Sequence, residues 1–430
     1  MKLRIEKAIY GGASLARVPA DGPADLAGKA VFVPLALPAE LVEATIVSDR
    51  RSYITATLDS VFEPAPSRTT PGCEYYGRCG GCHYQHADYS AQLAMKRGIL
   101  IETLERAHVD VPGEFRVLSA DPWSYRNRIR LHVTTTALSY REAASHRDLP
   151  VTHCPVAAPI LQRVIYAFNE LLQKQPSLAQ SLSEVEFFTA ADESALLISL
   201  FTQQGKSSEH LPRSVADALF TTLPSLQGVR TFSLDPRTRR IQSSAAWGRP
   251  SLDYTVGSLR YQVSAGAFFQ VNRYLIPALV EEVVAKRTGN IAWDLYAGVG
   301  LFARALAQRF DQVIAVESSP SSTADLVHNL RGPAHKHVSR DTLRFLQSSP
   351  AQTPDLVVVD PPRAGLGSDV CHQLAAVQPR QIVYVSCDPS TLARDLRALQ
   401  PSGYRPVAVT LIDLFPQTFH LETVATLERE

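Results

Sequence analysis

The stretch Ile291-Ala-Trp-Asp-Leu-Tyr-Ala-Gly-Val-Gly300 decides the fold of this chain. Its first part, Ile291–Tyr296, is a mostly apolar run of strand length, and Leu301–Arg309 has helical periodicity. Between them, Gly298 and Gly300 predict a tight turn. A strand, a glycine turn and a helix form a cradle for a nucleotide-like ligand, because glycine lets the ligand approach the backbone closely. One such turn is a weak signal, so the fold prediction depends on the strands that follow.

Acidic residues close three further strand-like runs of this region. Glu317 ends the next apolar run, at the spacing where such folds hold ribose hydroxyls, and Asp341 ends a third. Asp360 follows a fourth and precedes two prolines, which stiffen the chain beyond it. Because strands alternate with helical stretches from residue 291 onward, we predict a doubly wound α/β domain with a mostly parallel sheet. The acids would then share the ligand-binding edge of that sheet.

A cysteine stands at the next change from strand to helix, in Tyr384-Val-Ser-Cys-Asp-Pro389. We expect a strand over Gln381–Val385 and a helix over Ser390–Leu399, with Asp388 as its N-cap. Cys387 would then lie just outside the helix N-terminus, where the dipole lowers a thiol pKa and favours the nucleophilic thiolate. The alternative for a single cysteine is a small buried hydrophobic residue.

Two further parts are expected before the α/β domain, which we place at residues 261–430. Residues 1–62 consist of short strand-like runs separated by turn signals, a pattern typical of a small β-barrel of the oligonucleotide-binding kind. The clearest of these runs are Lys29–Leu35, Leu41–Asp49 and Tyr53–Phe62. Residues 63–260 then form a central β-rich domain. Within it, the partly helical segment 91–119 can pack with the α/β domain.

Composition limits the classes of protein to which the chain can belong. It has 430 residues, a net charge of +1 and six cysteines. The neutral charge gives no global support for nucleic-acid binding, so any such surface would be local. No apolar run approaches the roughly 18–20 residues of a membrane span, and no secretory signal is visible at the N-terminus. The cysteines therefore suggest a reducing, cytoplasmic location and no disulfide framework.

Taken together, these motifs resemble the S-adenosylmethionine-dependent RNA 5-methyluridine methyltransferases. The resemblance is carried by Asp294-Leu-Tyr-Ala-Gly-Val-Gly300, Glu317, Asp360-Pro-Pro-Arg363 and Ser386-Cys-Asp-Pro389, and extends to Phe268-Phe-Gln-Val-Asn272 and His420-Leu-Glu-Thr-Val424. It implies a Rossmann-like methyltransferase domain, and the first 62 residues look like the family's TRAM barrel. Most members have Asn where this chain has Leu301, which removes one expected cofactor hydrogen bond.

The chemistry of this family explains why a cysteine and a carboxylate are needed. Uracil C5 is too weak a nucleophile to take up a methyl group directly, whereas a thiolate adding at C6 makes C5 a carbanion equivalent. A base must then remove the C5 proton. By resemblance, Cys387 is the nucleophile and Glu422 the base. The residues implied in cofactor binding are Gln270, Tyr296, Gly298, Gly300, Glu317, Asp341 and Asp360.

A second group of cysteines lies in the central part of the chain. Cys73, Cys79 and Cys82 are separated by five and two residues, and Cys154 is a candidate fourth ligand. Close thiols in a reducing compartment usually hold a metal or cluster. Within the family, this arrangement resembles members that carry a 4Fe–4S cluster and act on 23S rRNA. The alternatives are free thiols or zinc, whose fourth ligand would be His83, His86 or Cys154.

RNA is the expected partner of a monomeric enzyme, although its contacts are hard to locate. The basic stretch Tyr125–His132 predicts a strand whose arginines face phosphates, or else a solvated strand face. A uridine in an RNA loop is the natural target, because its base must leave the stack to reach Cys387. Two alternatives remain at this stage: a tRNA 5-methyluridine methyltransferase, and a non-catalytic RNA-binding factor in ribosome assembly.

Overall fold

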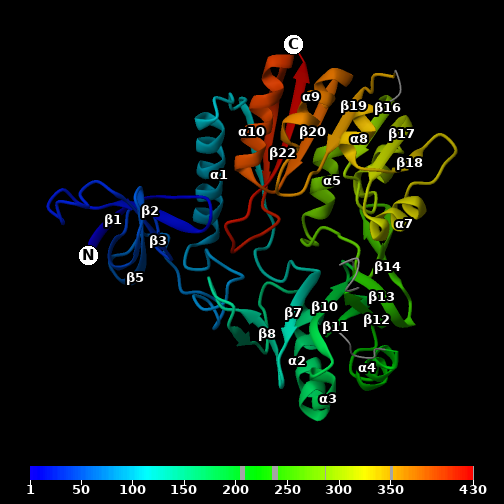
Figure 1. Cartoon of the computed structure of the whole chain (residues 1–430), viewed down its shortest axis with the longest axis horizontal. Helices are drawn as coiled ribbons and strands as arrows, with labels where there is room; N and C mark the ends of the chain where they lie inside the picture. The colour runs from blue at the N-terminus through cyan, green and yellow to red at the C-terminus, as the bar shows by residue number, and fades with distance from the viewer. Residues whose placement is uncertain (204–208, 235–240, 286, 349–351, 430) are drawn as a thin grey trace.

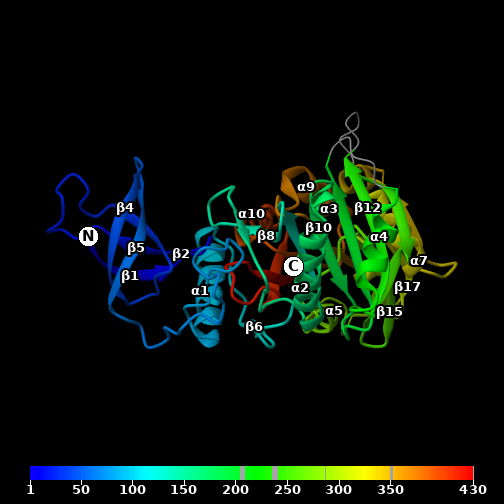
Figure 2. The same ribbon diagram turned by 90° about the horizontal axis from the view of Figure 1, so that it is seen from below.

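The computed structural model describes residues 1–203, 209–234, 241–285, 287–348 and 352–429. A small barrel stands at one end of the molecule, and helix α1 lies between it and the remainder (Figures 1 and 2). The remainder consists of a central sheet and a larger C-terminal α/β sheet, which lie at opposite ends of the view in Figure 1. No helix among the described residues is both long and apolar enough to cross a membrane.

The N-terminal barrel is closed in the strand order β1-β2-β3-β5-β4, which confirms the predicted small barrel. Its strands are β1 (Lys2–Ala8), β2 (Ala13–Arg17), β3 (Ala30–Pro34), β4 (Leu41–Asp49) and β5 (Tyr53–Glu63). Alternating side chains such as Leu3 and Ile5 point inward and are almost completely buried. The turn from β1 to β2 depends on Gly11 and Gly12, whose φ angles of 105° and 92° are costly for other residues.

The central part is a seven-stranded sheet in the order β13-β12-β11-β10-β7-β8-β9. These strands are β7 (Arg128–Val133), β8 (Leu138–Arg141), β9 (Asp148–Pro150), β10 (Leu182–Thr189), β11 (Leu196–Thr202), β12 (Leu226–Leu234) and β13 (Ile241–Gly248). Its helices are α2 (Pro159–Lys174), α3 (Pro176–Ala179) and α4 (Leu211–Leu219). The apolar stripe of α2, including Leu161 and Phe168, forms one core with sheet residues such as Phe187 and Ile198.

The C-terminal sheet has eight strands in the order β18-β17-β16-β19-β20-β22-β21-β6. The strands are β16 (Gly289–Leu295), β17 (Phe310–Glu317), β18 (Lys336–Ser339), β19 (Leu356–Val359), β20 (Gln381–Ser386), β21 (Tyr404–Ile412), β22 (Glu422–Arg429) and β6 (Glu114–Leu118). From β18 to β20 all neighbours are parallel, whereas β22 runs antiparallel to both β20 and β21. The predicted alternation of strands and helices is therefore confirmed, in a mixed sheet.

Helices and a hairpin surround this sheet. The helices are α5 (Ile276–Val284), α6 (Leu301–Leu306), α7 (Pro320–Asn329), α8 (Thr342–Gln347), α9 (Gly367–Val377), α10 (Pro389–Leu399) and the 3-10 turn Gln400–Ser402. The hairpin of β14 (Ser251–Val256) and β15 (Leu259–Ser264) is attached to α7 through Asp325, which accepts hydrogen bonds from the backbone N–H and hydroxyl of Ser264. This attachment fixes the start of the segment from Gly266 to Asn272, which forms part of the candidate site.

Two elements that precede the central sheet in sequence lie with the C-terminal sheet. Strand β6 pairs in parallel with β21 at its edge. Helix α1 (Tyr89–Arg106) is capped by Asp88, and Leu100 and Leu104 lie in the same core as Tyr384 and Leu396 of the C-terminal sheet and α10. The chain thus visits the C-terminal sheet before it builds the central one.

Candidate active site

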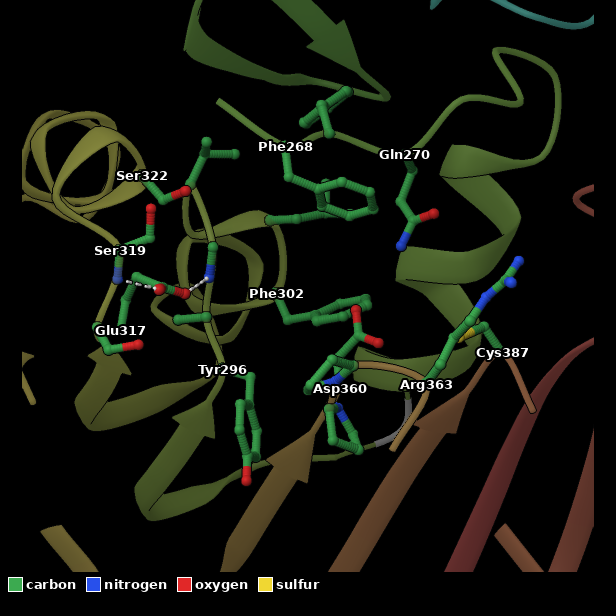
Figure 3. Close-up of a pocket in the computed structure, with 18 of the residues that line it drawn as sticks. Phe268, Gln270, Tyr296, Phe302, Glu317, Ser319, Ser322, Asp360, Arg363 and Cys387 are labelled. Atoms are coloured by element: carbon green, nitrogen blue, oxygen red, sulfur yellow. Dashed lines mark hydrogen bonds between the residues drawn. The ribbon is translucent and has the colours of Figure 1, made fainter. Parts of the chain in front are cut away.

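Four strands of the C-terminal sheet end at one cavity of about 850 Å³. Tyr296 follows β16, Glu317 ends β17, Asp360 follows β19 and Cys387 follows β20. Because these strands are parallel, their carboxyl ends meet at one edge, where open α/β sheets bind ligands. The cavity is lined by six of the seven predicted cofactor residues, the exception being Gly300. It is also lined by Cys387 and Glu422. Figure 3 shows many of these side chains surrounding a common space.

The glycine turn after β16 has the backbone conformation that its sequence predicts. Tyr296, Gly298 and Gly300 have φ angles of 65°, 55° and 87°. A Cβ atom at Gly300 would lie 2.8 Å from Cδ1 of Leu326, so this glycine allows α6 to pack closely against α7. A Cβ atom at Gly298 would meet no atom of the described residues within 4 Å, which leaves space for a ligand beside the backbone.

Glu317 is held by the backbone on both sides of its strand end. Its carboxylate accepts hydrogen bonds from the N–H groups of Gly298 at 2.8 Å and Ser319 at 2.6 Å (Figure 3). Glu317 therefore connects the glycine turn to the start of α7 while it lines the cavity. Asp341 lies at the cavity too, but it is exposed and caps α8 by accepting hydrogen bonds from Leu343 and Arg344.

The opposite wall of the cavity comes from the segment before α5. The Gln270 side chain points toward the cavity, and Phe268 lies beside it with 65% of its surface exposed (Figure 3). Buried Asn127 donates a hydrogen bond to the carbonyl oxygen of Gln270, and Asn272 donates one to that of Leu414. These amides fix the wall against both the central sheet and the chain that leads to Glu422.

The antiparallel register of β20 and β22 brings Cys387 and Glu422 to the same edge of the sheet. Ser386 is paired with Thr423, and the next residue outward on each strand is Cys387 on one and Glu422 on the other. Asp388 caps α10 as predicted, accepting hydrogen bonds from the N–H groups of Ser390 and Thr391 at 3.0 Å. The proposed nucleophile and base thus lie side by side in the cavity.

The expected lowering of the Cys387 pKa is wrong. Burial, followed by the negative charges of Glu422 and Asp360, raises the pKa of Cys387 to about 11. These effects outweigh the helix dipole, whose influence is usually worth no more than about 1 kcal/mol. The guanidinium of Arg363 acts in the opposite direction and favours the thiolate.

The pKa values of the two carboxyl groups near Cys387, those of Asp360 and Glu422, are also raised. Burial raises the pKa of Asp360 to about 7. Burial and the charge of Asp360 raise the pKa of Glu422 well above its ordinary value. Clustered acids with raised pKa values are typical of functional sites, where a carboxyl group must exchange a proton near neutral pH.

Several cavity residues had no role assigned from the sequence. These are chiefly Phe268, Phe302, Ser319, Ser322, Arg363, Phe415 and His420. Nη2 of Arg363 lies 3.2 Å from Nδ1 of His420, and burial lowers the pKa of His420 to about 4, so its ring is neutral. For two of them, the position in the sequence could have indicated a place in the site. Arg363 directly follows the Asp-Pro-Pro turn, and His420 precedes Glu422 by two residues.

The four cysteines predicted as ligands line a second, smaller cavity of about 90 Å³, together with Arg126 and Tyr140. They are Cys73, Cys79, Cys82 and Cys154, all unpaired and partly buried. Burial raises the pKa of Cys82 to about 12, and the charge of Arg126 acts against this rise. Across the described ranges, no three His, Cys, Asp or Glu side chains are arranged to hold a single metal ion.

The arginines of β7 are engaged within the central sheet. Arg130 forms an ion pair with Glu184 on β10, and its guanidinium lies 3.8 Å from the ring centre of Phe201. Arg128 donates a hydrogen bond to the carbonyl oxygen of Ala267 and lies over the ring of Phe188. The structure therefore pairs these predicted phosphate contacts with groups of the protein itself.

Comparison with known proteins identifies the family. The family model described as tRNA (Uracil-5-)-methyltransferase matches residues 88–340 and 350–430. The chain belongs to this family. It is accordingly an S-adenosylmethionine-dependent RNA (uracil-5-)-methyltransferase, which confirms the resemblance seen in the sequence.

Other RNA methyltransferases match along nearly the whole chain. An uncharacterized RNA methyltransferase from Aquifex aeolicus is 32% identical, with 100% of this chain and 98% of the relative covered. The 23S rRNA (uracil(1939)-C(5))-methyltransferase RlmD from Chromohalobacter salexigens is 31% identical, with coverages of 100% and 89%. The tRNA (uracil-54, C5)-methyltransferase of Pyrococcus abyssi, solved with S-adenosyl-L-homocysteine, shares the fold, with a TM-score of 0.77, 23% identity and coverages of 99% and 100%.

Proposed function

We propose that this enzyme methylates C5 of a uridine in a loop of 23S rRNA, with Cys387 as nucleophile and Glu422 as base. The observation that carries the proposal is the placement of these two side chains side by side in the strand-end cavity. The cavity volume of about 850 Å³ is large enough for a cofactor and a flipped base together.

Cys387, Glu422 and Arg363 have different roles in the proposed reaction. The Cys387 thiolate forms a bond to C6 of uracil, and the electrons of the C5–C6 double bond move to the carbonyl oxygen at C4. S-adenosylmethionine, when bound, supplies the methyl group that C5 takes up. Glu422 then removes the proton from C5, the double bond re-forms, and the sulfur leaves C6. Arg363 favours the thiolate form that begins this sequence.

The opposite side of the cavity has the groups that a cationic, nucleoside-containing cofactor needs. Glu317 is placed beside the open backbone of Gly298, where ribose hydroxyls bind in related folds. Tyr296 and Gln270 offer a ring and an amide, and the carboxylates of Asp341 and Asp360 can oppose positive charge. Gly300 does not line the cavity and instead allows α6 to pack closely against α7.

Two observations bear on the choice of RNA. The relative from Chromohalobacter, named for 23S rRNA, aligns with the full length of this chain. The four-cysteine cavity agrees with the cluster-bearing members that the sequence resembles. A tRNA substrate is the second candidate, because the matching family model is described by tRNA.

The test is to incubate the protein with isotopically labelled S-adenosylmethionine and unmodified 23S rRNA, tRNA or DNA, and to identify the labelled nucleoside by mass spectrometry. We expect 5-methyluridine in 23S rRNA. The same nucleoside in tRNA alone would overturn the rRNA assignment and keep the mechanism. Methylated cytosine or adenine would overturn the roles of Cys387 and Glu422. No product with any RNA would favour a non-catalytic assembly factor.

We further propose that Cys73, Cys79, Cys82 and Cys154 hold a 4Fe–4S cluster. All four line one cavity, and the positive charge of Arg126 favours the thiolate forms of Cys79 and Cys82. A single zinc ion, held by Cys73, Cys79 and Cys82 with Cys154, His83 or His86, is the alternative. Methyl transfer needs no electron, so the cluster would order this loop.

Anaerobic purification followed by iron and sulfide analysis tests the cluster. We expect about four iron and four sulfide per chain and a brown protein. Replacement of Cys154 by serine should reduce the iron content, whereas the buried Cys371 of α9, which lies in the core of the C-terminal domain, should be replaceable by alanine without loss of iron. Stoichiometric zinc with no sulfide would contradict the cluster.

A further inference from the structure

The N-terminal barrel reaches the candidate active site through the turn between β1 and β2. The hydroxyl of Tyr10, the first residue of this turn, donates a hydrogen bond to Oδ2 of Asp388 at 3.2 Å. Asp388 directly follows Cys387, and its other oxygen, Oδ1, accepts the hydrogen bonds that cap α10. One carboxylate therefore connects a barrel tyrosine to the helix that begins beside Cys387.

The same tyrosine contacts the segment that carries Glu422. The ring of Tyr10 packs edge-on against that of Phe419, with ring centres 5.5 Å apart. The ring centres of Phe419 and His420 are 4.3 Å apart. His420 lies two residues before Glu422. Gly12 completes this contact, because a Cβ atom there would lie 3.1 Å from the rings of both His83 and Phe419. The turn is thus shaped to fit between the loop of His83 and the segment before Glu422.

The barrel is held in this position by contacts on both sides of the turn. Lys7 forms an ion pair with Glu102 of α1 at 2.6 Å. At the other end, the buried carboxylate of Glu40 accepts hydrogen bonds from the backbone N–H of Ala65 and the guanidinium of Arg68, in the segment that follows β5. The position of Tyr10 is therefore determined by the docked barrel.

We propose that Tyr10 is a positioning residue for methyl transfer, which acts through Asp388 on the nucleophile Cys387. A carboxylate beside a thiol disfavours the thiolate, and a hydrogen bond from an uncharged hydroxyl withdraws negative charge from that carboxylate. The same bond keeps Asp388 in the orientation that caps α10. The barrel thereby contributes a side chain that supports the nucleophile from outside the cavity, in addition to any contact with RNA. This inference rests on the proposed role of Cys387.

Thiol reactivity tests the inference without RNA or cofactor. In Tyr10→Phe the ring and its packing on Phe419 remain, and only the hydroxyl is lost. We expect alkylation of Cys387 by iodoacetamide at pH 8 to slow by about three- to tenfold, with its pH profile moved to higher pH. We expect kcat to fall by a similar factor, with little change in KM for RNA. The rate is read from the mass of the peptide that contains Cys387.

A matched control and a second variant make the result specific. Tyr53 is a partly exposed barrel tyrosine that packs on Phe32 far from the cavity, so Tyr53→Phe should leave the alkylation rate unchanged. Asp388→Asn keeps a capping side chain but removes its charge, and in that background Tyr10→Phe should have little further effect.

Three results would overturn the proposal. One is an unchanged alkylation rate in folded Tyr10→Phe protein. Another is a rise in KM alone, which would make Tyr10 an RNA contact. The third is a Tyr10→Phe effect of equal size with and without the charge of Asp388. Failure of the proposed function would be seen elsewhere, as methylation by a protein that lacks the Cys387 thiol, so the two failures are distinguishable.

Discussion

Ser386 on β20 is paired with Thr423 on β22, and this register directs Cys387 and Glu422 to leave the sheet next to each other. Backbone hydrogen bonds of two buried strands set their proximity, so neither residue depends on a mobile loop for its position. A shift by one residue would point every side chain of β22 to the other face and remove Glu422 from the cavity.

Replacing the nucleophile should separate binding from chemistry. We expect Cys387→Ala to lower methyl transfer by at least about a thousandfold, because C5 is not activated without a bond at C6. S-adenosylmethionine binding, measured by calorimetry, should be retained. The control is Cys371→Ala, a buried thiol outside the cavity, which should keep activity and lose only about 1 kcal/mol of stability. Appreciable turnover by Cys387→Ala would contradict the assignment.

Replacing the base should trap the reaction at the covalent stage. Glu422→Gln keeps the shape of the side chain but cannot remove the C5 proton, so the sulfur cannot leave C6. We expect a protein–RNA adduct that survives denaturing electrophoresis, and none when Cys387 is also replaced by alanine. Glu428→Gln, an exposed change further along β22, should form no lasting adduct. Normal turnover by Glu422→Gln would mean that another group removes the proton.

The strand-end part of the site could be predicted from the sequence. Glu317, Asp360 and Cys387 each follow a short apolar run, and the ends of parallel strands necessarily meet at one edge. Asp388 and Pro389 likewise gave the start of α10, because capping depends on neighbouring residues only. Local rules of this kind do not need knowledge of the tertiary fold.

Features that depend on distant neighbours could not be predicted. The Cys387 pKa is raised mainly by burial and by Glu422, which only the register of β22 brings close. Arg130 looked free for phosphate until the pairing of β7 with β10 placed Glu184 beside it. The contact of Tyr10 with Asp388 crosses most of the chain, and neither residue has a motif that would suggest it.

The raised pKa of Asp360 predicts a dependence of stability on pH. Burial moves this pKa from 3.8 to about 7, so the folded protein favours the protonated form. The resulting stabilisation is complete below about pH 4 and is lost as the pH rises through 7. Asp360→Asn cannot ionise, and we expect it to be more stable than the original protein by about 1–3 kcal/mol at pH 8 and equal to it near pH 4.

Urea unfolding of the ligand-free protein between pH 4 and pH 8.5 measures this difference. Asp311→Asn, an exposed change on β17, provides the control and should show no such trend. If the free energies of unfolding of Asp360→Asn and of the original protein differ by the same amount at every pH in this range, Asp360 does not titrate in the predicted window.

A buried ion pair holds the chain segment that leads to Glu422. Nζ of Lys96 on α1 lies 2.5 Å from Oδ1 of Asp413 and 2.9 Å from the carbonyl oxygen of Phe415, and the side chains of the ion pair are completely inaccessible to solvent. Tyr89 donates a further hydrogen bond to Asp413. Helix α1 thus connects directly to the loop between β21 and β22.

Removing the cation should therefore leave a buried carboxylate without a partner charge. We expect Lys96→Met to lower the free energy of unfolding by about 3–5 kcal/mol, and Asp413→Asn in the same protein to recover part of this loss, because an amide still accepts the Tyr89 bond. Lys7→Met, which breaks a partly exposed ion pair, should cost less than about 1 kcal/mol. Urea titration compares the three variants. If Lys96→Met cost no more than Lys7→Met, the buried pair would not be what secures this loop, and the position of Glu422 would depend on the register of β22 alone.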